Sequence, residues 1–155
     1  MLDTQKIKRL LAVCLDDEAA LPGLVPALEK LRKDLPDAAL SLLTMPQYCE
    51  KARSLGFLAH LLAYPSRTIE YLDVKAVCSL IEHIRQGHFD TAIIFTRLGH
   101  SPYLPAYACY LAGVPIRAGQ SLEFGGGVLS HCFTPAPADS EPQEAFLYLL
   151  HAAGL

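Results

Sequence analysis

The sequence predicts an α/β fold: a Rossmann-like, three-layer domain built on a mainly parallel five-stranded sheet. Short apolar runs alternate with segments of helical periodicity, which is typical of strand–helix–strand units. Hydrophobic residues make up 52% of the chain and charged residues only 19%, with a mean hydropathy of +0.25, as expected when strands are covered on both faces. A length of 155 residues fits a single domain, residues 1–155.

Five strands are predicted from short apolar segments. In chain order they are Leu10–Cys14, Ala39–Leu43, Phe57–Tyr64, Thr91–Phe95 and Pro115–Arg117. The first is an unbroken apolar run, as expected of a strand buried on both faces. The fourth contains Ile93 and Ile94, whose β-branched side chains favour extended backbone.

Helices are predicted where apolar residues recur at helical spacing. In chain order they are Leu21–Leu35, Pro46–Ser54, Val77–Gly87, Tyr103–Gly113 and Gln143–Ala153. Pro36 is expected to end the first of them, and Pro26 inside it predicts a late start or a bend, because proline lacks the amide hydrogen. Residues 134–142 hold three prolines and predict a connector to the last helix.

The predicted order of strands in the sheet places three loops at one edge. Right-handed crossovers give the order 3-2-1-4-5 most simply, and ligands of such sheets bind beyond the carboxyl ends of the strands. The loops that follow the first, fourth and fifth strands are Leu15–Leu21, Thr96–Pro102 and Ala118–His131. We therefore expect Asp16 and Gly125 to lie at the same end of the sheet.

Composition argues against several classes of function. A net charge of −3 and a pI of about 6.0 make a nucleic-acid partner a poor expectation. No apolar run reaches the ~18 residues that cross a bilayer, so no transmembrane segment is expected. The first residues, Met1–Lys6, lack the layout of a signal peptide, which predicts a cytoplasmic location.

The cysteines and the glycine pattern argue against metal and cofactor sites. The cysteines are Cys14, Cys49, Cys78, Cys109 and Cys132. Their odd number and wide spacing predict neither disulfides nor a zinc site. The first loop has no GxGxxG motif, so no dinucleotide is expected. A phospho-receiver domain would need a lysine after the fifth strand, where this chain has Arg117. We therefore expect no metal and no cofactor.

Three acidic residues, Asp16, Asp17 and Glu18, follow the first predicted strand. Acids at a helix start commonly cap free amides and complement the helix dipole, and this is the interpretation we favour. The alternative is that one of them is a metal ligand or a general base.

Polar residues also follow the fourth strand. Arg97, His100 and Ser101 could hold a phosphate or carboxylate there, although a solvated arginine is as common. The remaining histidines of the central region, His60 and His83 among them, show no ligand spacing and are interpreted as structural.

The segment after the fifth strand is the most informative. Gln120, Ser121 and Glu123 supply polar groups that suit sugar hydroxyls. Gly125, Gly126 and the glycine after them would let the backbone approach a ligand closely or adopt positive φ. The alternative is a flexible surface loop.

Three segments of the chain are distinctive: Phe95–Tyr103, Tyr110–Ser121 and Glu123–Gly126. Together they resemble the amino-terminal domain of glycosyltransferase family 9, the heptosyltransferase-type family. Similarity of the first strand–helix unit and of the closing helix, Leu149–Leu155, extends the resemblance along essentially the whole chain. Its most specific part runs from Ser101 to Gly126.

The resemblance implies one half of a GT-B enzyme of lipopolysaccharide biosynthesis. In that family the amino-terminal domain receives the acceptor sugar, and the carboxyl-terminal domain binds the nucleotide-activated heptose. We therefore expect a sugar acceptor as ligand, and as partner either a carboxyl-terminal donor-binding chain or a second copy of this chain. The expected acceptor-binding residues are Arg97, His100, Ser101, Gln120, Ser121, Glu123, Gly125 and Gly126.

The resemblance also locates a catalytic base, and there the sequence departs from the family. A Gly-Asp pair that carries the base falls on Ala19 and Ala20. Alanine cannot accept a proton, so the base is missing unless Asp17 or Glu18 substitutes for it. The sequence therefore predicts a domain that is inactive by itself. The alternative is a non-catalytic sugar- or protein-binding domain derived from the family.

Overall fold

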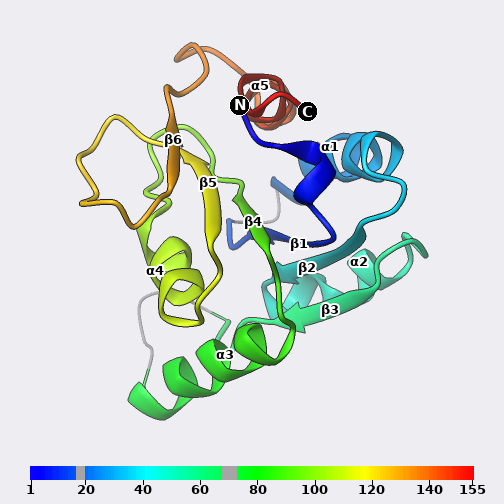
Figure 1. Cartoon of the computed structure of the whole chain (residues 1–155), viewed down its shortest axis with the longest axis vertical. Helices are drawn as coiled ribbons and strands as arrows, with labels where there is room; N and C mark the ends of the chain where they lie inside the picture. The colour runs from blue at the N-terminus through cyan, green and yellow to red at the C-terminus, as the bar shows by residue number, and fades with distance from the viewer. Residues whose placement is uncertain (17–19, 68–72) are drawn as a thin grey trace.

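The computed structural model describes residues 1–16, 20–67 and 73–155. Within these residues, a sheet of six parallel strands lies at the centre of the molecule, in the order β3-β2-β1-β4-β5-β6 (Figure 1). The strands are β1 (Arg9–Cys14), β2 (Ala39–Thr44), β3 (His60–Ala63), β4 (Thr91–Ile94), β5 (Ile116–Gln120) and β6 (His131–Phe133). The predicted α/β, Rossmann-like fold is confirmed, as is the order of the first five strands.

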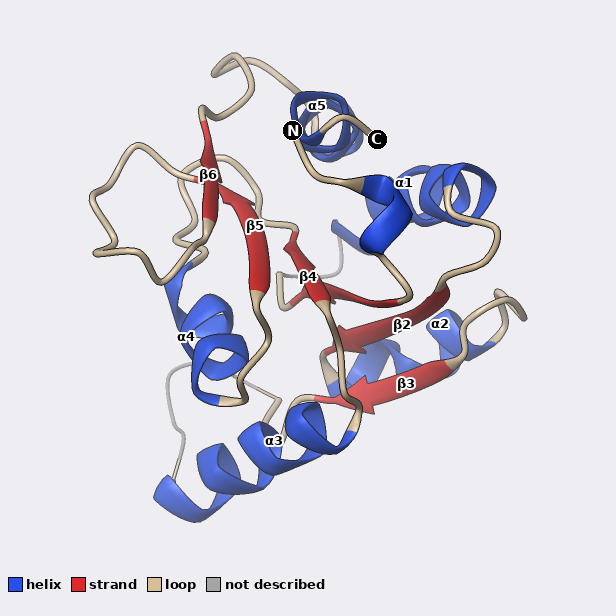
Figure 2. Cartoon of the chain, in the orientation of Figure 1, coloured by secondary structure: helices blue, strands red, loops and turns tan. Residues whose placement is uncertain are grey.

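Helices cover both faces of the sheet (Figure 2). They are α1 (Ala20–Asp34), α2 (Cys49–Arg53), α3 (Val74–Gln86), α4 (Tyr103–Leu111) and α5 (Pro142–Ala153). Side chains of β1 alternate between two cores: Leu10 and Ala12 pack with α1 and α5, whereas Leu11 and Val13 pack with α3 and α4. None of these helices, in the part of the chain that the structure describes, is long and apolar enough to cross a membrane.

The sixth strand corrects the sequence prediction, which had five. β6 pairs in parallel with β5 through Ala118↔His131, Gly119↔Cys132 and Gln120↔Phe133. It is a short edge strand whose side chains are exposed or only partly buried, so it presents no apolar run in the sequence. Its stability comes from ladder hydrogen bonds, which composition does not reveal. β3 is also shorter than predicted and covers only residues 60–63.

The first helix runs without interruption through Pro26 and does not start late, which was one of the two outcomes predicted from that proline. α1 begins at Ala20 and contains Pro26 in its interior. Its first turn lies close to α5, because a Cβ atom on Gly23 would meet the backbone nitrogen of Gln143 at 2.9 Å and the Cβ of Pro142 at 3.3 Å. Gly23 therefore permits the close approach of the two helices.

α5 begins at Pro142, which the sequence placed in the connector. Glu141 is its N-cap and forms a capping box with Glu144, whose Oε2 accepts the Glu141 amide at 3.2 Å. The amide of Leu2 donates to the Ala153 carbonyl at 2.7 Å, so the two ends of the chain lie side by side (Figure 1).

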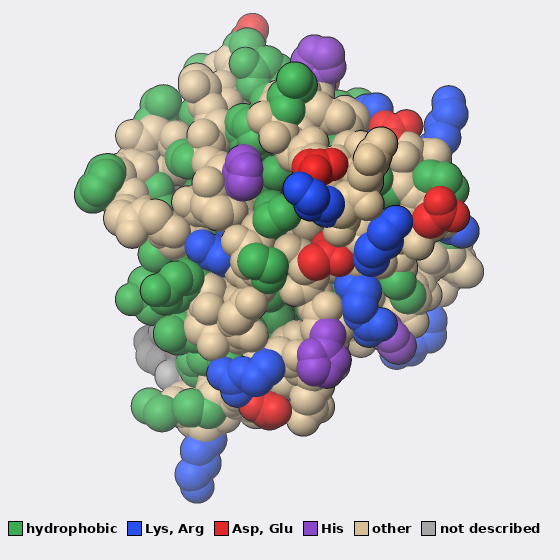
Figure 3. All heavy atoms as spheres, in the orientation of Figure 1, with side chains coloured by type: hydrophobic (Ala, Val, Ile, Leu, Met, Phe, Trp, Pro, Cys, Tyr) green, Lys and Arg blue, Asp and Glu red, His purple; other side chains and the backbone are tan. Residues whose placement is uncertain are grey.

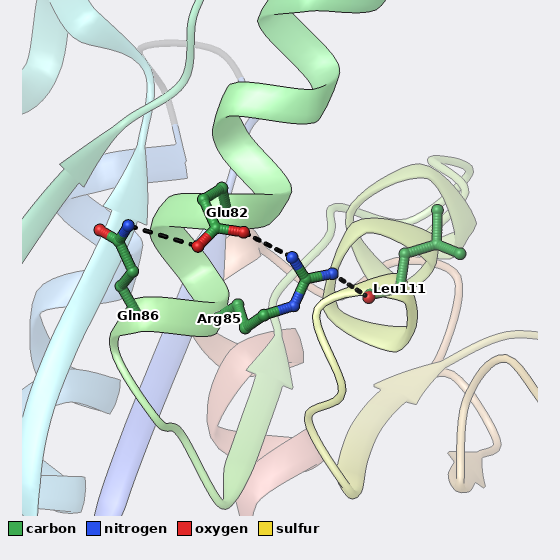
Figure 4. A network of polar contacts seen from close by, with 4 residues as sticks. All are labelled: Glu82, Arg85, Gln86 and Leu111. Carbon is green, nitrogen blue, oxygen red and sulfur yellow. Dashed lines mark hydrogen bonds and ion pairs between the residues drawn. The ribbon is translucent and has the colours of Figure 1, made fainter.

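Arg85 joins α3 to α4, the two helices on the face of the sheet opposite α1 and α5 (Figure 4). Its Nη1 donates to Glu82 Oε2 at 2.5 Å within α3, and its Nη2 donates to the Leu111 carbonyl of α4 at 3.1 Å. Gln86 Nε2 donates to the second oxygen of Glu82 at 3.3 Å. Residue 115 is a proline without an amide hydrogen, so the Leu111 carbonyl has no α-helical partner and the arginine satisfies it.

Gly23→Ala is expected to lower the free energy of unfolding by up to about 2 kcal/mol. The methyl group must displace the α5 backbone, a strain of ~1–3 kcal/mol that exceeds the ~1 kcal/mol gained in helix propensity. Urea unfolding followed by circular dichroism measures the change. Glu29→Ala, at an exposed position of the same helix, is the control and should leave stability within about 0.5 kcal/mol. A Gly23→Ala protein more stable than the wild type would contradict the close approach.

Candidate functional site

A hollow of about 200 Å³ lies beyond the carboxyl ends of β4 and β5. Its walls are residues 96–101 after β4 and residues 120–123, which are the last residue of β5 and the start of the loop after it, with Pro135 completing it. Asp16 and Gly125 lie at this same edge, since Asp16 contacts residues 97 and 100 and Gly125 contacts Tyr103, which follows that loop. The expectation that these loops share one end of the sheet is met.

The structure brings most of the predicted acceptor-binding residues together. Those that line the hollow are Arg97, His100, Ser101, Gln120, Ser121 and Glu123. Gly125 and Gly126 are not among the lining residues. Asp17 and Glu18, the suggested substitutes for the base, lie outside the described residues. That the lining residues bind a sugar remains a prediction.

Asp16 connects the end of β1 to the loop after β4. Its Oδ2 accepts the Arg97 amide at 2.5 Å, and its Oδ1 lies 2.8 Å from His100 Nδ1. The carboxylate is only 6% exposed. Both carboxylate oxygens contact the loop after β4, which the interpretation of these acids as helix caps did not include. Residues 17–19, which lead into α1, lie outside the described residues, so that interpretation stays a prediction. Among the described residues, no group of three potential ligands could hold a metal ion.

His100 is held through Nδ1 of its ring, and its side chain is half exposed. An ionised carboxylate only accepts hydrogen bonds, so the contact with Asp16 requires that Nδ1 carries the proton. Half of the side chain, 51%, is exposed, and it lines the hollow. In the neutral ring Nε2 is then the unprotonated nitrogen and can accept a hydrogen bond.

This pairing was missed because Asp16 was interpreted together with its sequence neighbours. The two residues are 84 positions apart. The predicted strand order nevertheless contained the signal: it places the first strand beside the fourth, and Asp16 and His100 each follow one of these strands.

Gln120 contributes an unsatisfied polar group to the opposite wall. It ends β5 and is 6% exposed, and its Nε2 has no hydrogen-bond partner among the described residues. An unmet buried donor destabilises the protein by ~1–3 kcal/mol. A ligand oxygen in the hollow could accept from this carboxamide after a rotation of its end group.

The glycines after β5 have structural explanations of their own. A Cβ atom on Gly125 would lie 1.9 Å from the Tyr103 ring, whose hydroxyl donates to the Glu123 carbonyl at 2.5 Å. Gly126 and Gly127 have φ values of 57° and 82°, which favour glycine. Gly125 therefore accommodates an aromatic ring of the protein itself, and its predicted contact with a ligand is not needed to explain it.

Arg117 of β5 binds backbone carbonyls of the glycine-containing loop between β5 and β6. Its guanidinium donates to the carbonyls of Val128 at 2.6 Å, Gly127 at 3.3 Å and Val114 at 2.5 Å. It also lies over the Tyr110 ring, 5.1 Å from the centroid, in a cation–π contact. Arg117 thus anchors the later part of the loop between β5 and β6, and the Tyr103 hydroxyl holds its earlier part through the Glu123 carbonyl.

Hydrophobic side chains gather on the surface beside the hollow (Figure 3, left side). At the tip of the loop after β5, Leu122 is 84% exposed and Phe124 is 98% exposed. Leu104, Tyr107 and Tyr110 of α4 are also exposed. A separate apolar cavity of about 320 Å³ lies between α3 and α4 and is lined by residues of both helices.

Comparison with known proteins identifies the fold. The glycosyl transferase family 9 structure from Veillonella parvula DSM 2008 superposes with a TM-score of 0.71 at 18% identity, over 95% of this chain and 41% of that one. E. coli heptosyltransferase WaaC with ADP-2-deoxy-2-fluoro heptose gives 0.69 at 10% identity, over 94% and 48%. WaaC with ADP gives 0.65 at 11% identity, over 92% and 46%. No protein-family model and no curated protein sequence matches the chain.

The fold is therefore that of one part of these glycosyltransferases. The chain spans less than half the length of each structure that it resembles. At these identities the likeness concerns the fold. The resemblance noted in the sequence is confirmed at this level.

The position that the resemblance assigned to the base is closed to solvent. Ala20 is the first residue of α1, is 0% exposed and belongs to the core between the sheet, α1 and α5. A carboxylate at this position would lie in the core, without access to an acceptor hydroxyl in the hollow.

Ala20→Asp is accordingly expected to destabilise the domain and not to create a base. A lone buried carboxylate is strongly disfavoured, and we expect a loss of about 3 kcal/mol or more in the free energy of unfolding. Ala138→Asp, which places the same charge on an exposed loop, should change stability by less than about 0.5 kcal/mol. Thermal unfolding of both variants measures the difference. Equal stability of the two would show that residue 20 faces solvent.

Proposed function

We propose that this chain is the acceptor-side half of a family 9-type glycosyltransferase and that the hollow beyond β4 and β5 holds a sugar acceptor. The observation that carries the proposal is the position of the hollow: polar side chains from two loops converge at the carboxyl edge of a parallel sheet, on the fold of these glycosyltransferases.

The chemistry of the hollow suits a hydroxyl-rich ligand. Ser101 and Ser121 can donate and accept, Arg97 only donates, and Glu123 in its ionised form only accepts. Gln120 adds a donor without a partner among the described residues. The volume, about 200 Å³, is below the ~300–1,000 Å³ of pockets for drug-sized ligands, which fits one end of an oligosaccharide whose remainder extends into solvent.

The donor half is proposed to come from another polypeptide segment. WaaC is described with ADP and with ADP-2-deoxy-2-fluoro heptose, and this chain covers 46–48% of its length. We propose that a separate chain, or the rest of a longer protein, binds the nucleotide-activated sugar. The exposed Leu122 and Phe124 beside the hollow would lie toward that partner. The present chain alone would then bind an acceptor without transferring a sugar, in the cytoplasm and in lipopolysaccharide synthesis.

The second candidate is a non-catalytic domain that binds a sugar or a protein. The alanine at the position aligned with the family's base favours it. The first candidate predicts a sugar acceptor in the hollow, and the second predicts either a sugar there or a protein bound over its rim. The two differ in whether a sugar is transferred when a donor-binding half is present.

Calorimetry should detect binding of a lipopolysaccharide inner-core oligosaccharide to the isolated chain, and little or no heat with ADP-heptose. Gln120→Leu should weaken oligosaccharide binding about tenfold, since one buried hydrogen bond to the ligand is lost. The same variant should be at least as stable as the wild type, because an unsatisfied donor is removed from the interior.

Gln143→Leu, on the exposed surface of α5, is the matched control and should bind like the wild type. Oligosaccharide binding that is unaffected by Gln120→Leu would move the acceptor away from the hollow. Micromolar affinity for ADP-heptose would assign the donor to this half.

A further inference from the structure

The Asp16–His100 pair lies at the hollow proposed to hold the acceptor. Its carboxylate is buried, and its imidazole is half exposed and is one of the side chains that line the hollow. A base held by a second, buried group is the arrangement by which enzymes activate hydroxyl nucleophiles.

We propose that His100 is the general base of the transfer reaction and that Asp16 is its positioning residue. This rests on the function proposed above, in which the hollow holds the acceptor. It replaces the carboxylate expected after β1 with an imidazole that follows β4. Asp16 remains a carboxylate after β1, but it acts through the ring and does not touch the substrate.

Two hydrogen bonds fix the chemical state of the pair. The Arg97 amide donates to Asp16 Oδ2 at 2.5 Å and occupies that oxygen. The second oxygen faces His100 Nδ1 at 2.8 Å. Because a backbone amide cannot change its role, the carboxylate is held with Oδ1 toward the ring. The neutral ring therefore carries its one proton on Nδ1, which leaves Nε2 as the proton acceptor.

The proposed step balances with a nucleotide-activated sugar as the second substrate. Nε2 takes the proton of the acceptor hydroxyl as its oxygen forms the bond to the anomeric carbon of the donor sugar. The bond from that carbon to the phosphate oxygen breaks, and the nucleoside diphosphate leaves with the electron pair. The imidazolium that results is stabilised by the Asp16 carboxylate. A base of this kind contributes typically ~10²–10⁴-fold to the rate.

Asp16→Asn separates this role from a purely structural one. The single amide oxygen of asparagine must still accept from the Arg97 amide, so its NH₂ group is turned toward Nδ1. Nδ1 then has to accept, and the proton moves to Nε2. The fold and the position of the ring are retained, but the nitrogen in the hollow can no longer take a proton.

Nitrogen-15 NMR of the full chain with labelled histidine tests the proposal, at a pH where imidazoles are neutral. His100→Asn, at a half-exposed position, assigns the His100 signals by their loss. We expect the wild-type ring to be protonated on Nδ1 and the Asp16→Asn ring on Nε2. His131, whose Nδ1 lies 3.0 Å from the rotatable hydroxyl of Ser130, serves as control and should not respond to Asp16→Asn.

Addition of the inner-core oligosaccharide supplies the second readout. In the wild type the Nε2 signal should shift toward that of a hydrogen-bonded acceptor. In Asp16→Asn binding should persist within about tenfold, since Nε2–H can donate to the same hydroxyl. His100→Asn should weaken binding by about two- to tenfold.

The outcomes distinguish this inference from the function on which it rests. A wild-type ring protonated on Nε2 overturns the base, whether or not the sugar binds. A bound sugar that shifts the amides of Gln120 and Ser121 but not His100 Nε2 also overturns it, and leaves the proposed function intact. Absence of binding overturns both. If Asp16→Asn does not fold, the wild-type protonation state and the oligosaccharide shift still decide.

Discussion

The buried carboxylate of Asp16 is the interaction on which the arrangement of the site depends. Burial of a carboxylate is tolerated only when hydrogen bonds replace the lost water, and both oxygens of Asp16 are used, one by the Arg97 amide and one by His100. The contacts join the ends of β1 and β4, which are neighbours in the sheet. The loop after β4 consequently begins at a fixed point, and its imidazole lines the hollow.

The other wall depends on a different set of contacts. Arg117 donates to the Val128 carbonyl in the loop after β5 and to the Val114 carbonyl before β5, and Tyr103 packs against Gly125 while donating to the Glu123 carbonyl. One wall is therefore positioned by a buried anion and the other by a buried cation. Polar side chains supported in this way lose little conformational entropy when a ligand binds, which favours affinity.

Much of this architecture could be predicted from the sequence, because parallel strands buried on both faces leave unbroken apolar runs. The order of five strands followed from the alternation of runs and helices and from the handedness of the crossovers. β6 escaped prediction because edge pairing leaves no hydrophobic pattern, and the continuity of α1 through Pro26 because packing against α5 outweighed local propensity.

The site was only partly predictable, for a similar reason. Polar residues after β4 and β5 were identified because strand ends are visible in the sequence. The partner of His100 was not, since a contact between residues 84 positions apart depends on the register of two strands. The roles of Gly125 and Arg117 are set by Tyr103 and by loop carbonyls, whose positions no local pattern encodes.

The central claim is that the hollow at the carboxyl edge of β4 and β5 is the sugar site. Backbone amide shift mapping of the full chain with an inner-core oligosaccharide tests it most directly. The account predicts that the largest shifts fall on residues 96–101 and 120–123, which line the hollow. Shifts concentrated instead on α3 and α4, around the apolar cavity between these helices, would contradict it.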